Sequence, residues 1–398
     1  MHAMHILLQR LRAACPVMHL RRLQALLACV SAALRARRLT VTELGRALPG
    51  QSRAKHGIKR ADRLAGNIHF AHERLDVYAA IARWLLGDAQ RPIIIIDWSD
   101  VARDRQWQLL RAAVPVGGRT LTLYEEVHPL KRLANPRVHA AFLRRLKAVL
   151  PESVVPIMIT DAGFRTPWFR AVSKLGWHYI GRIRNRDGVR AAGATAWISC
   201  KSLYPKANRQ ARALGPYELV RGSSIDCRLY LIKHPKKHRV HKSVYGKPMH
   251  SSESRARARM QSEPWLLAAS PSLEELSATD IVAFYAKRMQ IEEAFRDLKC
   301  TRYGMGFELH RSRDCKRVAA LLLIASLALL VLWLIGMTAR TNGLQHHYQS
   351  NTRRTRPVLS VFYLACLHLR HCLYSSPPRL PSILPALLAS PDCAFDTI

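Results

Sequence analysis

Residues 91–97 read RPIIIID, four consecutive isoleucines followed by an aspartate. A run that is apolar at every position, without alternation, predicts a strand buried on both faces of a sheet. The run VVPIMITD at 154–161 has the same form and is followed by the turn residues Ala162 and Gly163. Carboxylates at the carboxyl ends of such strands emerge at the rim of the sheet, where α/β proteins commonly place their sites. Asp97 and Asp161 are therefore candidate site residues, with a turn or helix-cap role as the alternative for each.

The segments around these two runs predict a mixed sheet. Strands are expected at 92–97, 106–114, 120–127, 154–161 and 264–269, with a Gly117–Gly118 turn after the second and an amphipathic helix at 139–150 before the fourth. Three antiparallel strands, a helix and a fourth strand are the outline of a ribonuclease H-like fold. We therefore expect an α/β protein with a ribonuclease H-like catalytic core and a β-rich insertion, flanked by helical N-terminal and C-terminal regions.

A third acid lies in a segment with helical spacing. At about 100° per residue, one continuous helix would place five polar side chains on a face roughly 60 to 80° wide. These side chains are Tyr285, Arg288, Glu292, Arg296 and Lys299. Thr279 or Asp280 is expected to cap the helix. A solvated charged face with ordinary i,i+4 pairs is the alternative.

The chain carries a large excess of positive charge. Its 398 residues include 63 Lys and Arg against 27 Asp and Glu, a formal net charge of +36. Such a field destabilises a compact fold unless a polyanion meets it, so nucleic acid is the first candidate partner, ahead of anionic lipid or a ribosomal role. Basic clusters at 182–190, 201–212, 233–247 and 255–259 are interrupted by Gly, Pro, His or Ser and are expected to form loops and short strands that track phosphates.

Four domains are expected along the chain. Because 292 − 161 leaves 131 positions between the second and third acids, the middle of this interval is interpreted as an insertion. The piece at 42–48 resembles a short helix-turn-helix element, and 55–63 supplies a second basic helix, with a generic helical bundle as the alternative. The domains are a helical, basic DNA-binding domain at 1–90, the catalytic core at 91–183 and 263–338, the β-rich insertion at 184–262, and a helical C-terminal region at 339–398 for end binding or dimerisation.

Cysteine and histidine usage argues against disulfides and zinc. The nine cysteines are scattered and none forms a CxxC pair, so we expect a reduced cytoplasmic chain. His238 and His241 have ligand spacing, but the lysines and arginine around them repel a cation. We assign both histidines to the basic surface.

Residues 318–337 are uncharged, apolar and long enough to cross a bilayer. The central helix of a soluble core is also apolar all round, and the flanking chain is strongly basic. We expect this segment to be buried in a soluble core, with no membrane partner; a membrane span is the alternative. No secretory signal is expected, because Arg10 and Arg12 interrupt the apolar residues at the N-terminus.

Three carboxylates without Cys or His ligands suit hard cations, so Mg²⁺ is the expected cofactor and Mn²⁺ a substitute. Two such ions about 3.5 to 4 Å apart activate an attacking oxygen and stabilise the leaving oxygen at phosphorus. The neighbouring side chains hold the substrate phosphates. Arg288 can donate two parallel hydrogen bonds, Lys299 acts as a point charge, and Tyr285 can donate one hydrogen bond.

Taken together, these motifs resemble the insertion-sequence-four family of DDE transposases. The family signature appears as Tyr285-x2-Arg288-x3-Glu292-x6-Lys299, and nearly the whole chain shares in the resemblance. The further matching stretches are DWSD at 97–100, LRAAVPVGGRTLTLYE at 110–125, TDAGF at 160–164 and KRMQIEEAFRDLK at 287–299. The resemblance implies that Asp97, Asp161 and Glu292 form a metal-binding catalytic triad and that Tyr285, Arg288 and Lys299, with Arg296 beside them, contact transposon-end phosphates.

The resemblance also implies cut-and-paste transposition. A 3′ hydroxyl freed at the transposon end attacks the opposite strand to form a hairpin, water reopens it, and the end joins target DNA. Trp265 matches a stacking tryptophan of the family, with a plain core aromatic as the alternative. Met289 stands where some relatives carry a second tryptophan, and its thioether can wedge between bases.

The expected partners are DNA, as terminal inverted repeats and as target, and a second copy of the chain in a synaptic complex. The expected location is the bacterial cytoplasm, associated with the nucleoid. A ribonuclease H-like, metal-dependent nuclease without strand transfer is the alternative function. A DNA binder without catalytic activity is a further alternative, which the intact acids disfavour.

Overall fold

The computed structural model describes residues 2–50, 53–102, 104–184, 187–235, 247–249, 251–254, 263–352 and 356–372. The basic cluster at 255–259 lies outside the described residues, as do His238, His241 and the rest of 236–246. The chain separates into two compact units. Unit 1 comprises residues 1–154 and 289–398, and unit 2 comprises residues 155–288.

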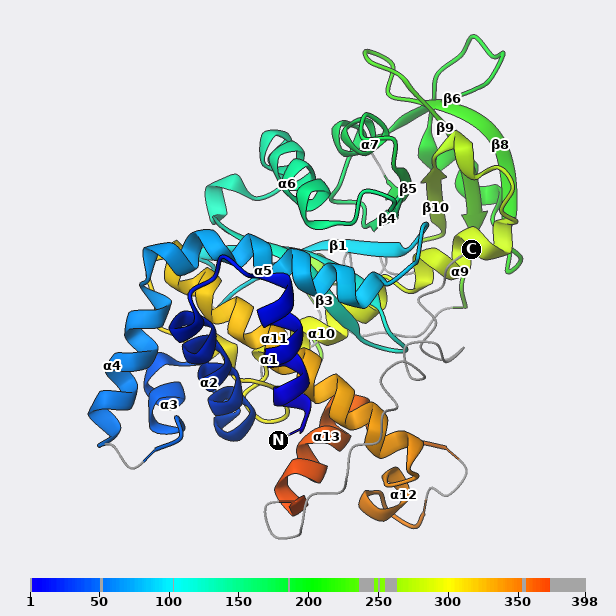
Figure 1. The fold of residues 1–398 in the computed structure, drawn as a ribbon. Coiled ribbons are helices and arrows are strands. Elements are labelled where there is room, and N and C mark those ends of the chain that lie inside the picture. The colour runs from blue at the N-terminus through cyan, green and yellow to red at the C-terminus, as the bar shows by residue number, and fades with distance from the viewer. Residues whose placement is uncertain are drawn as a thin grey trace. The chain divides into compact units, whose positions relative to one another are not determined.

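The sheet of unit 1 is an antiparallel meander in the order β3-β2-β1. Figure 1 labels β1 and β3 of this sheet. Its strands are β1 (Ile93–Asp100), β2 (Trp107–Pro115) and β3 (Thr120–Pro129). The strands expected at 92–97, 106–114 and 120–127 are confirmed. However, β1 continues three residues past its expected end, so Asp97 lies within the strand and not at its carboxyl end. Gly117 and Gly118 form the β2–β3 turn with φ of 69° and 90°, values that glycine adopts without strain.

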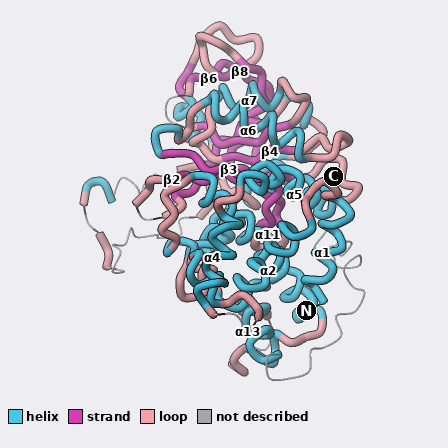
Figure 2. The backbone as a smooth tube through the Cα atoms, turned by 60° about the vertical axis from the view of Figure 1, so that its left-hand side comes forward, coloured by secondary structure: helices cyan, strands magenta, loops and turns pink. Residues whose placement is uncertain are grey.

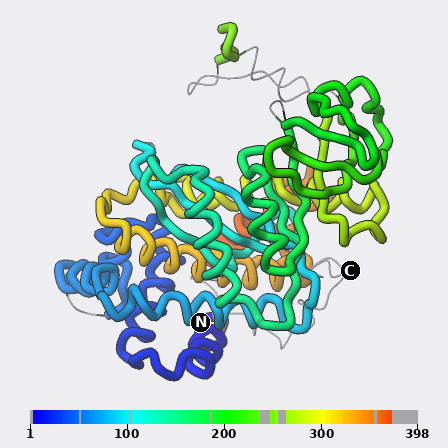
Figure 3. Tube along the Cα trace, turned by 90° about the horizontal axis from the view of Figure 1, so that it is seen from above, coloured from blue at the N-terminus to red at the C-terminus, as the bar shows by residue number. Residues whose placement is uncertain are grey.

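Helices pack around this sheet. They are α1 (His2–Ala14), α2 (Leu20–Ala36), α3 (Val41–Arg46), α4 (Ala54–Ala65), α5 (Ile68–Leu86), α6 (Pro136–Val149), α10 (Met289–Lys299), α11 (Cys315–Thr341), α12 (Gln345–Tyr348) and α13 (Val361–Cys372), with 3-10 turns η1 (Leu130–Arg132) and η4 (Phe307–Leu309). Figure 2 shows the helices of this unit in cyan, and in Figure 3 the blue N-terminal helices lie beside the orange α11. Segments far apart in sequence therefore share one core.

The helix α11 is the centre of that core. Its side chains from Val318 to Ala339 are nearly all buried, and it packs against α2, α13 and β3. Among the described helices it is the one long and apolar enough to cross a bilayer, and 83% of its most apolar stretch is buried. The expected burial of residues 318–337 is confirmed. Removal of this much apolar surface from water is the main stabilising contribution in unit 1.

The short helices α3 and α4 cross at two glycines. A Cβ on Gly45 would collide with the backbone of Ile58, and one on Gly57 would collide with the carbonyl of Gly45. Thr40 caps α3 by accepting a hydrogen bond from the backbone N–H of Glu43 at 3.1 Å. Helices therefore occupy the two pieces expected at 42–48 and 55–63, and only residues without side-chain bulk allow so close a crossing.

The sheet of unit 2 has the order β4-β5-β10-β9-β8-β6-β7 among its described strands. The elements are β4 (Ile157–Thr160), α7 (Thr166–Ser173), β5 (His178–Ile183), β6 (Gly188–Ala191), β7 (Ile198–Ser199), η2 (Cys200–Lys206), β8 (Arg212–Leu219), β9 (Ile225–Ile232), β10 (Trp265–Ala269), η3 (Pro271–Leu273) and α9 (Ala278–Ala286). β4 and β5 are parallel and joined through α7, whereas β10 pairs antiparallel with both β5 and β9. The strand expected at 264–269 is confirmed, and β6 to β9 extend the same sheet.

The expected continuous helix through residues 285–299 is wrong. α9 ends at Ala286, residues 287 and 288 form a turn, and α10 begins at Met289. On one continuous helix the apolar stripe of α9 would be rotated by about 140° from that of α10. The stripes are Ile281, Val282 and Tyr285 in α9, and Ile291, Ala294, Phe295 and Leu298 in α10. A single continuous helix would expose one of the two stripes, so the helix is interrupted at residues 287 and 288.

The expected cap is also corrected. Ser277 is the N-cap of α9 and forms a reciprocal capping box with Asp280, whose carboxylate accepts hydrogen bonds from the backbone and hydroxyl of Ser277. Neither Thr279 nor Asp280 is itself the cap. Three positions separate the two capping residues, as this motif requires.

Candidate active site

Asp97 lies on the sheet face that α10 covers. In the register of unit 1, Asp97 is opposite Arg111 on β2, and Arg111 is opposite Glu125 on β3. Side chains directly opposite in antiparallel strands share a face, so these three point to one side and Trp98 points to the other. Asp97 is half-buried, and its Oδ1 accepts a hydrogen bond from the backbone N–H of Trp98 at 2.8 Å.

Lys299 joins the end of α10 to the end of β1. Its Nζ donates to Ser99 Oγ at 2.9 Å and to the carbonyl of Asp100 at 3.3 Å. Burial lowers the pKa of Lys299, while the charges of Asp100 and Asp97 act in the opposite direction. The cation is therefore placed beside the carboxyl end of β1, the strand that carries Asp97.

Glu292 is seven residues before Lys299 on the same helix. At 1.5 Å per residue this separation is about 10 Å along the axis, and offsets of four and seven keep Glu292, Arg296 and Lys299 on one face. Glu292 and Arg296 are exposed, and Lys299 is half-buried. Arg296 Nη1 donates to Glu293 Oε2 at 2.7 Å. Three residues of the expected shared face, Glu292, Arg296 and Lys299, therefore do share a face of α10. Tyr285 and Arg288 precede this helix.

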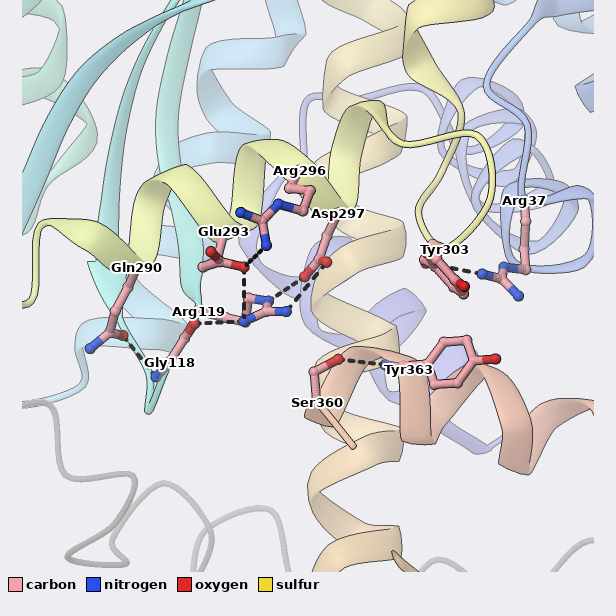
Figure 4. A network of polar contacts seen from close by, with 10 residues as sticks. All are labelled: Arg37, Gly118, Arg119, Gln290, Glu293, Arg296, Asp297, Tyr303, Ser360 and Tyr363. Atoms are coloured by element: carbon pink, nitrogen blue, oxygen red, sulfur yellow. Dashed lines mark hydrogen bonds and ion pairs between the residues drawn. The ribbon is translucent and has the colours of Figure 1, made fainter. Parts of the chain in front are cut away.

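The β2–β3 hairpin holds α10 from the side (Figure 4). The backbone N–H of Gly118 donates to Gln290 Oε1 at 3.1 Å, and Arg119 forms an ion pair with Asp297. Arg119 Nη1 also lies 3.9 Å from Glu293 Oε2. Burial raises the pKa of Asp297, and the hydrogen bond and charge of Arg119 oppose that effect. These contacts fix the rotation of α10 and hence the direction of Glu292.

A buried ion pair supports the same face from within. Arg111 Nη2 lies 2.7 Å from Glu125 Oε2, and both side chains are 1% exposed. Glu125 Oε1 accepts hydrogen bonds from Tyr78 on α5 at 3.0 Å and Ser326 on α11 at 2.8 Å. The Arg111 guanidinium lies over the Phe295 ring of α10, 5.2 Å from its centroid. The pair therefore connects the strand opposite Asp97 to three helices.

On the opposite face, Trp98 is anchored to α6. Its Nε1 donates to His139 Nε2 at 3.0 Å, and its ring meets the ring of His128 edge to face. Burial lowers the pKa of His139 from 6.5 to about 4. The neutral imidazole accepts the indole hydrogen bond, and protonation would remove that acceptor.

Acid is expected to destabilise the protein through His139. Because its pKa is lower in the folded than in the unfolded chain, stability should fall as pH decreases from about 6.5 to 4, by about 2 kcal/mol at pH 5. Urea unfolding at pH 7.5 and pH 5 measures this. His139→Gln should flatten the dependence, and the matched change of an exposed histidine, His72→Gln, should not. Equal pH dependence in wild type and His139→Gln would contradict the assignment.

In unit 2, Asp161 begins the turn after β4. Its Oδ1 accepts a hydrogen bond from the backbone N–H of Gly163 at 2.8 Å, and the side chain is half-buried. Tyr285 on α9 is 3% exposed. Burial raises the pKa of Tyr285, the charges of Arg288 and Arg182 lower it, and that of Asp161 raises it. Unit 2 therefore brings Asp161, Tyr285 and Arg288 into one electrostatic neighbourhood, together with Arg182.

Trp265 is the first residue of β10 and is half-buried. Its ring lies 5.0 Å from that of Tyr285 and 4.3 Å from that of His234, edge to face in both cases. Met289 is the first residue of α10 in unit 1 and is 37% exposed. Trp265 thus packs against aromatic rings of unit 2, whereas Met289 is partly exposed at the start of α10.

Comparison with known proteins identifies the family. Residues 88–331 match the model of the transposase DDE domain, more than half of the chain. The chain belongs to the DDE transposase family. Membership implies a DNA-cleaving enzyme of a class that typically uses divalent metal ions. The matched residues of the transposase include Asp97, Asp161 and Glu292.

No curated protein matches the sequence of the transposase. Among solved structures it is similar to a cryo-EM structure of the piggyBac transposase synaptic complex with hairpin DNA. The identity is 8% and the TM-score 0.41, with 91% of this chain and 74% of that chain covered. An identity and a TM-score this low establish neither a shared fold nor a shared ligand.

The three expected carboxylates of the transposase are divided between its units. Asp97 and Glu292 belong to unit 1, and Asp161 belongs to unit 2. Within the part of the chain that the structure describes, no three His, Cys, Asp or Glu side chains form a group able to hold a metal ion. The donor chemistry nevertheless fits a hard cation, because all three side chains are carboxylates.

Three further arginines contribute to this region without a signal in the sequence. Arg182 was assigned to a basic loop cluster but lies in β5, where it donates to the carbonyl of Pro264 at 3.2 Å, next to Trp265. Arg111 and Arg119 lie in a stretch that was singled out only as a motif. A charged residue within a strand gives no signal of burial by itself. The sequence also does not show which acid each arginine contacts, because Glu125 is 14 positions from Arg111 and Asp297 is 178 positions from Arg119.

Proposed function

We propose that the transposase is a cut-and-paste enzyme of the insertion-sequence-four family, similar to the transposase of transposon ten. In this proposal it binds terminal inverted repeats, cleaves transposon ends through a hairpin intermediate and joins the 3′ ends to target DNA. The observation that carries the proposal is the placement of α10, with Glu292, Arg296 and Lys299 on one face, beside the carboxyl end of β1, the strand that bears Asp97. Membership in the DDE transposase family supports it.

Asp97, Asp161 and Glu292 would hold the divalent metal ions, with Mg²⁺ as the natural cofactor and Mn²⁺ as a substitute. When bound, two such ions would supply charge stabilisation for the attacking and leaving oxygens in an in-line displacement at phosphorus. The chain itself supplies rigidity. The hairpin contacts of Arg119 and Gly118 set the rotation of α10, and the Arg111–Glu125 pair supports the sheet beneath it.

The cations and aromatics would position the DNA. Lys299 is already fixed by two hydrogen bonds beside the end of β1, so it would meet a phosphate without losing further side-chain freedom. Arg296 would exchange its exposed pair with Glu293 for a phosphate. Tyr285 and Arg288 would contact the end from unit 2. Trp265 would stack on an extruded base and Met289 would act as a wedge.

The larger assignments follow the same proposal. The catalytic core would be ribonuclease H-like, with residues 1–90 for DNA binding, 184–262 as the insertion and 339–398 for end binding or dimerisation. Two copies would pair two ends in a synaptic complex in the bacterial cytoplasm. The α/β architecture, the basic charge and the family support this arrangement.

The products of DNA cleavage test the proposal. Purified protein is incubated with duplexes ending in the inverted repeats that flank its gene, with a target plasmid and with Mg²⁺ or EDTA. Metal-dependent hairpins on denaturing gels, followed by joined products, are expected. Nicking of repeat and unrelated DNA alike, without joining, would favour the nuclease, and binding without any cleavage would contradict an enzymatic function.

A further inference from the structure

A groove lies in unit 1 outside the residues already assigned to catalysis. Its volume is about 660 Å³, between the start of α3 and the segment that leads from η4 into α11. The residues used below are Thr40, Thr42, His310, Arg311, Arg313 and Arg317, all of which line it. The exposed side chains of Thr42, Arg311 and Arg313 show that the groove is open to solvent. An open groove can take a polymer as well as a small molecule.

His310 is the unusual residue of this groove. Its ring is 8% exposed, and neither ring nitrogen has a hydrogen-bond partner among the described residues. Buried polar atoms in proteins are almost always hydrogen-bonded, and an unsatisfied one costs about 1 to 3 kcal/mol. Burial lowers the pKa of His310, so the neutral ring offers one N–H donor and one acceptor. A ligand in the groove would satisfy the donor.

The charge of the groove selects an anion. Arg311 and Arg313 are exposed and form no ion pair with any described residue. Arg317 is paired with Asp62, and the carboxylate of Asp314 caps α11 by accepting from the backbone N–H of Arg317 at 2.9 Å. Two arginines therefore remain for a ligand. A metal cation would be repelled, whereas guanidinium groups bind phosphate oxygens through paired N–H donors.

The groove is tied to the end of α10 that carries Lys299. The backbone N–H of Leu39, just before the groove, donates to the carbonyl of Met305 at 3.1 Å. Arg37 Nη2 donates to the carbonyl of Tyr303 at 3.1 Å (Figure 4). The charge of Asp104, at the turn after β1, acts on the pKa of His310. A ligand in the groove would therefore lie between the N-terminal helices and the turn that follows β1, the strand that bears Asp97.

We propose that this groove binds the sugar-phosphate backbone of transposon DNA. Arg311 and Arg313 pair with phosphates, His310 donates its N–H to a phosphate oxygen, and Thr40 and Thr42 border the path. Within unit 1, the groove carries the duplex from the N-terminal helices toward β1, the strand that bears Asp97. It reads no base sequence, because phosphate contacts set position and register. The proposal rests on the proposed transposase function.

Binding of the full-length protein to a fluorescent inverted-repeat duplex tests the groove. The assay uses Ca²⁺ in place of Mg²⁺ and several salt concentrations. The double variant Arg311→Ala/Arg313→Ala is expected to raise the Kd about tenfold. It is also expected to reduce the magnitude of the slope of log K against log salt by about 2, one for each lost phosphate contact. The matched control Arg144→Ala/Lys147→Ala, an exposed basic pair on α6, is expected to keep the wild-type slope. Wild-type affinity and slope in the Arg311/Arg313 variant would overturn the proposal.

His310→Phe keeps a planar aromatic side chain and removes the N–H donor. It is expected to weaken binding about threefold to tenfold with no fall in melting temperature, because no protein partner is lost. Duplexes with single neutral methylphosphonates locate the contact. At the phosphate held by the groove, the replacement should weaken wild type and leave the Arg311/Arg313 variant unaffected. If no position shows this difference, the proposal is wrong.

Competition separates DNA from a free anion. Millimolar inorganic phosphate at constant ionic strength is expected to leave DNA binding unchanged, and displacement of the duplex would identify a small-anion site instead. Cleavage by wild type in Mg²⁺ is followed in parallel. Normal cleavage and joining, with unaltered binding by the groove variants, would overturn the groove alone. Absence of metal-dependent cleavage would overturn the proposed function, while the salt slopes would still report on the groove.

Discussion

Glu292→Gln is expected to reduce hairpin formation and end joining by at least about 100-fold, because loss of a partner merely behind a metal ligand already costs about 10 to 100-fold. The change keeps the size of the side chain and removes one negative charge. Glu292 is exposed on α10, so the fold should survive and the affinity for inverted-repeat DNA should stay within about threefold of wild type. The loss should therefore appear in the rate of cleavage and only weakly in binding.

Single-turnover cleavage at saturating protein measures this effect, with binding followed in Ca²⁺. Glu293→Gln is the matched control, since Glu293 is the next residue and pairs with Arg296 and Arg119. Glu293→Gln should reduce the cleavage rate by less than about tenfold, because surface ion pairs contribute little to stability. Losses of equal size in the two variants would remove Glu292 from the proposed metal-binding carboxylates.

The Arg111–Glu125 pair should produce the largest stability effects. Arg111→Met or Glu125→Leu alone leaves an uncompensated buried charge, which costs about 3 to 5 kcal/mol. The double variant Arg111→Met/Glu125→Leu removes both charges and should recover most of that loss. Urea unfolding of the two single variants and the double variant gives the coupling energy. Additive losses in the double variant would show that the two side chains do not act as a pair.

Activity of that double variant separates stability from positioning. Phe295 of α10 lies under the Arg111 guanidinium, and Asp97 is opposite Arg111 on β1. A double variant as stable as wild type should still cleave DNA more slowly, because α10 loses the contact of Phe295 with Arg111 that positions it on the sheet. Tyr78→Phe, which removes only one hydrogen bond to Glu125, is the control and should cleave normally.

The sequence predicted the buried strands and helix correctly wherever a run of apolar residues indicates burial. The isoleucines of residues 93–96 predicted β1, the Trp265 run predicted β10, and the uncharged residues 318–337 predicted the buried helix α11. In each case the side chains themselves carry the free energy that drives burial. Asp161 directly follows β4, as expected, because it ends an apolar run. Asp97 also ends an apolar run but lies within β1, which continues to Asp100.

Other features depend on contacts between segments distant in sequence. The interruption at 287–288 arises because the apolar stripes of α9 and α10 would not share one face of a continuous helix. The regular spacing of the polar residues alone does not show this. The burial of Arg111 depends on Glu125, Tyr78 and Ser326, which come from three other elements. The role of His310 depends on a groove formed with residues 40–42. Local periodicity contains none of these pairings.

The central claim is that Asp97, Asp161 and Glu292 together hold the metal ions of the transposase. Anomalous diffraction from Mn²⁺ in crystals of the protein bound to an inverted-repeat duplex tests it most directly. We predict Mn²⁺ peaks within coordination distance, about 2.0 to 2.3 Å, of oxygens from all three carboxylates and of a phosphate at the transposon end. Mn²⁺ bound to the DNA complex at other side chains, with any of these three carboxylates more than about 5 Å from it, would contradict the account.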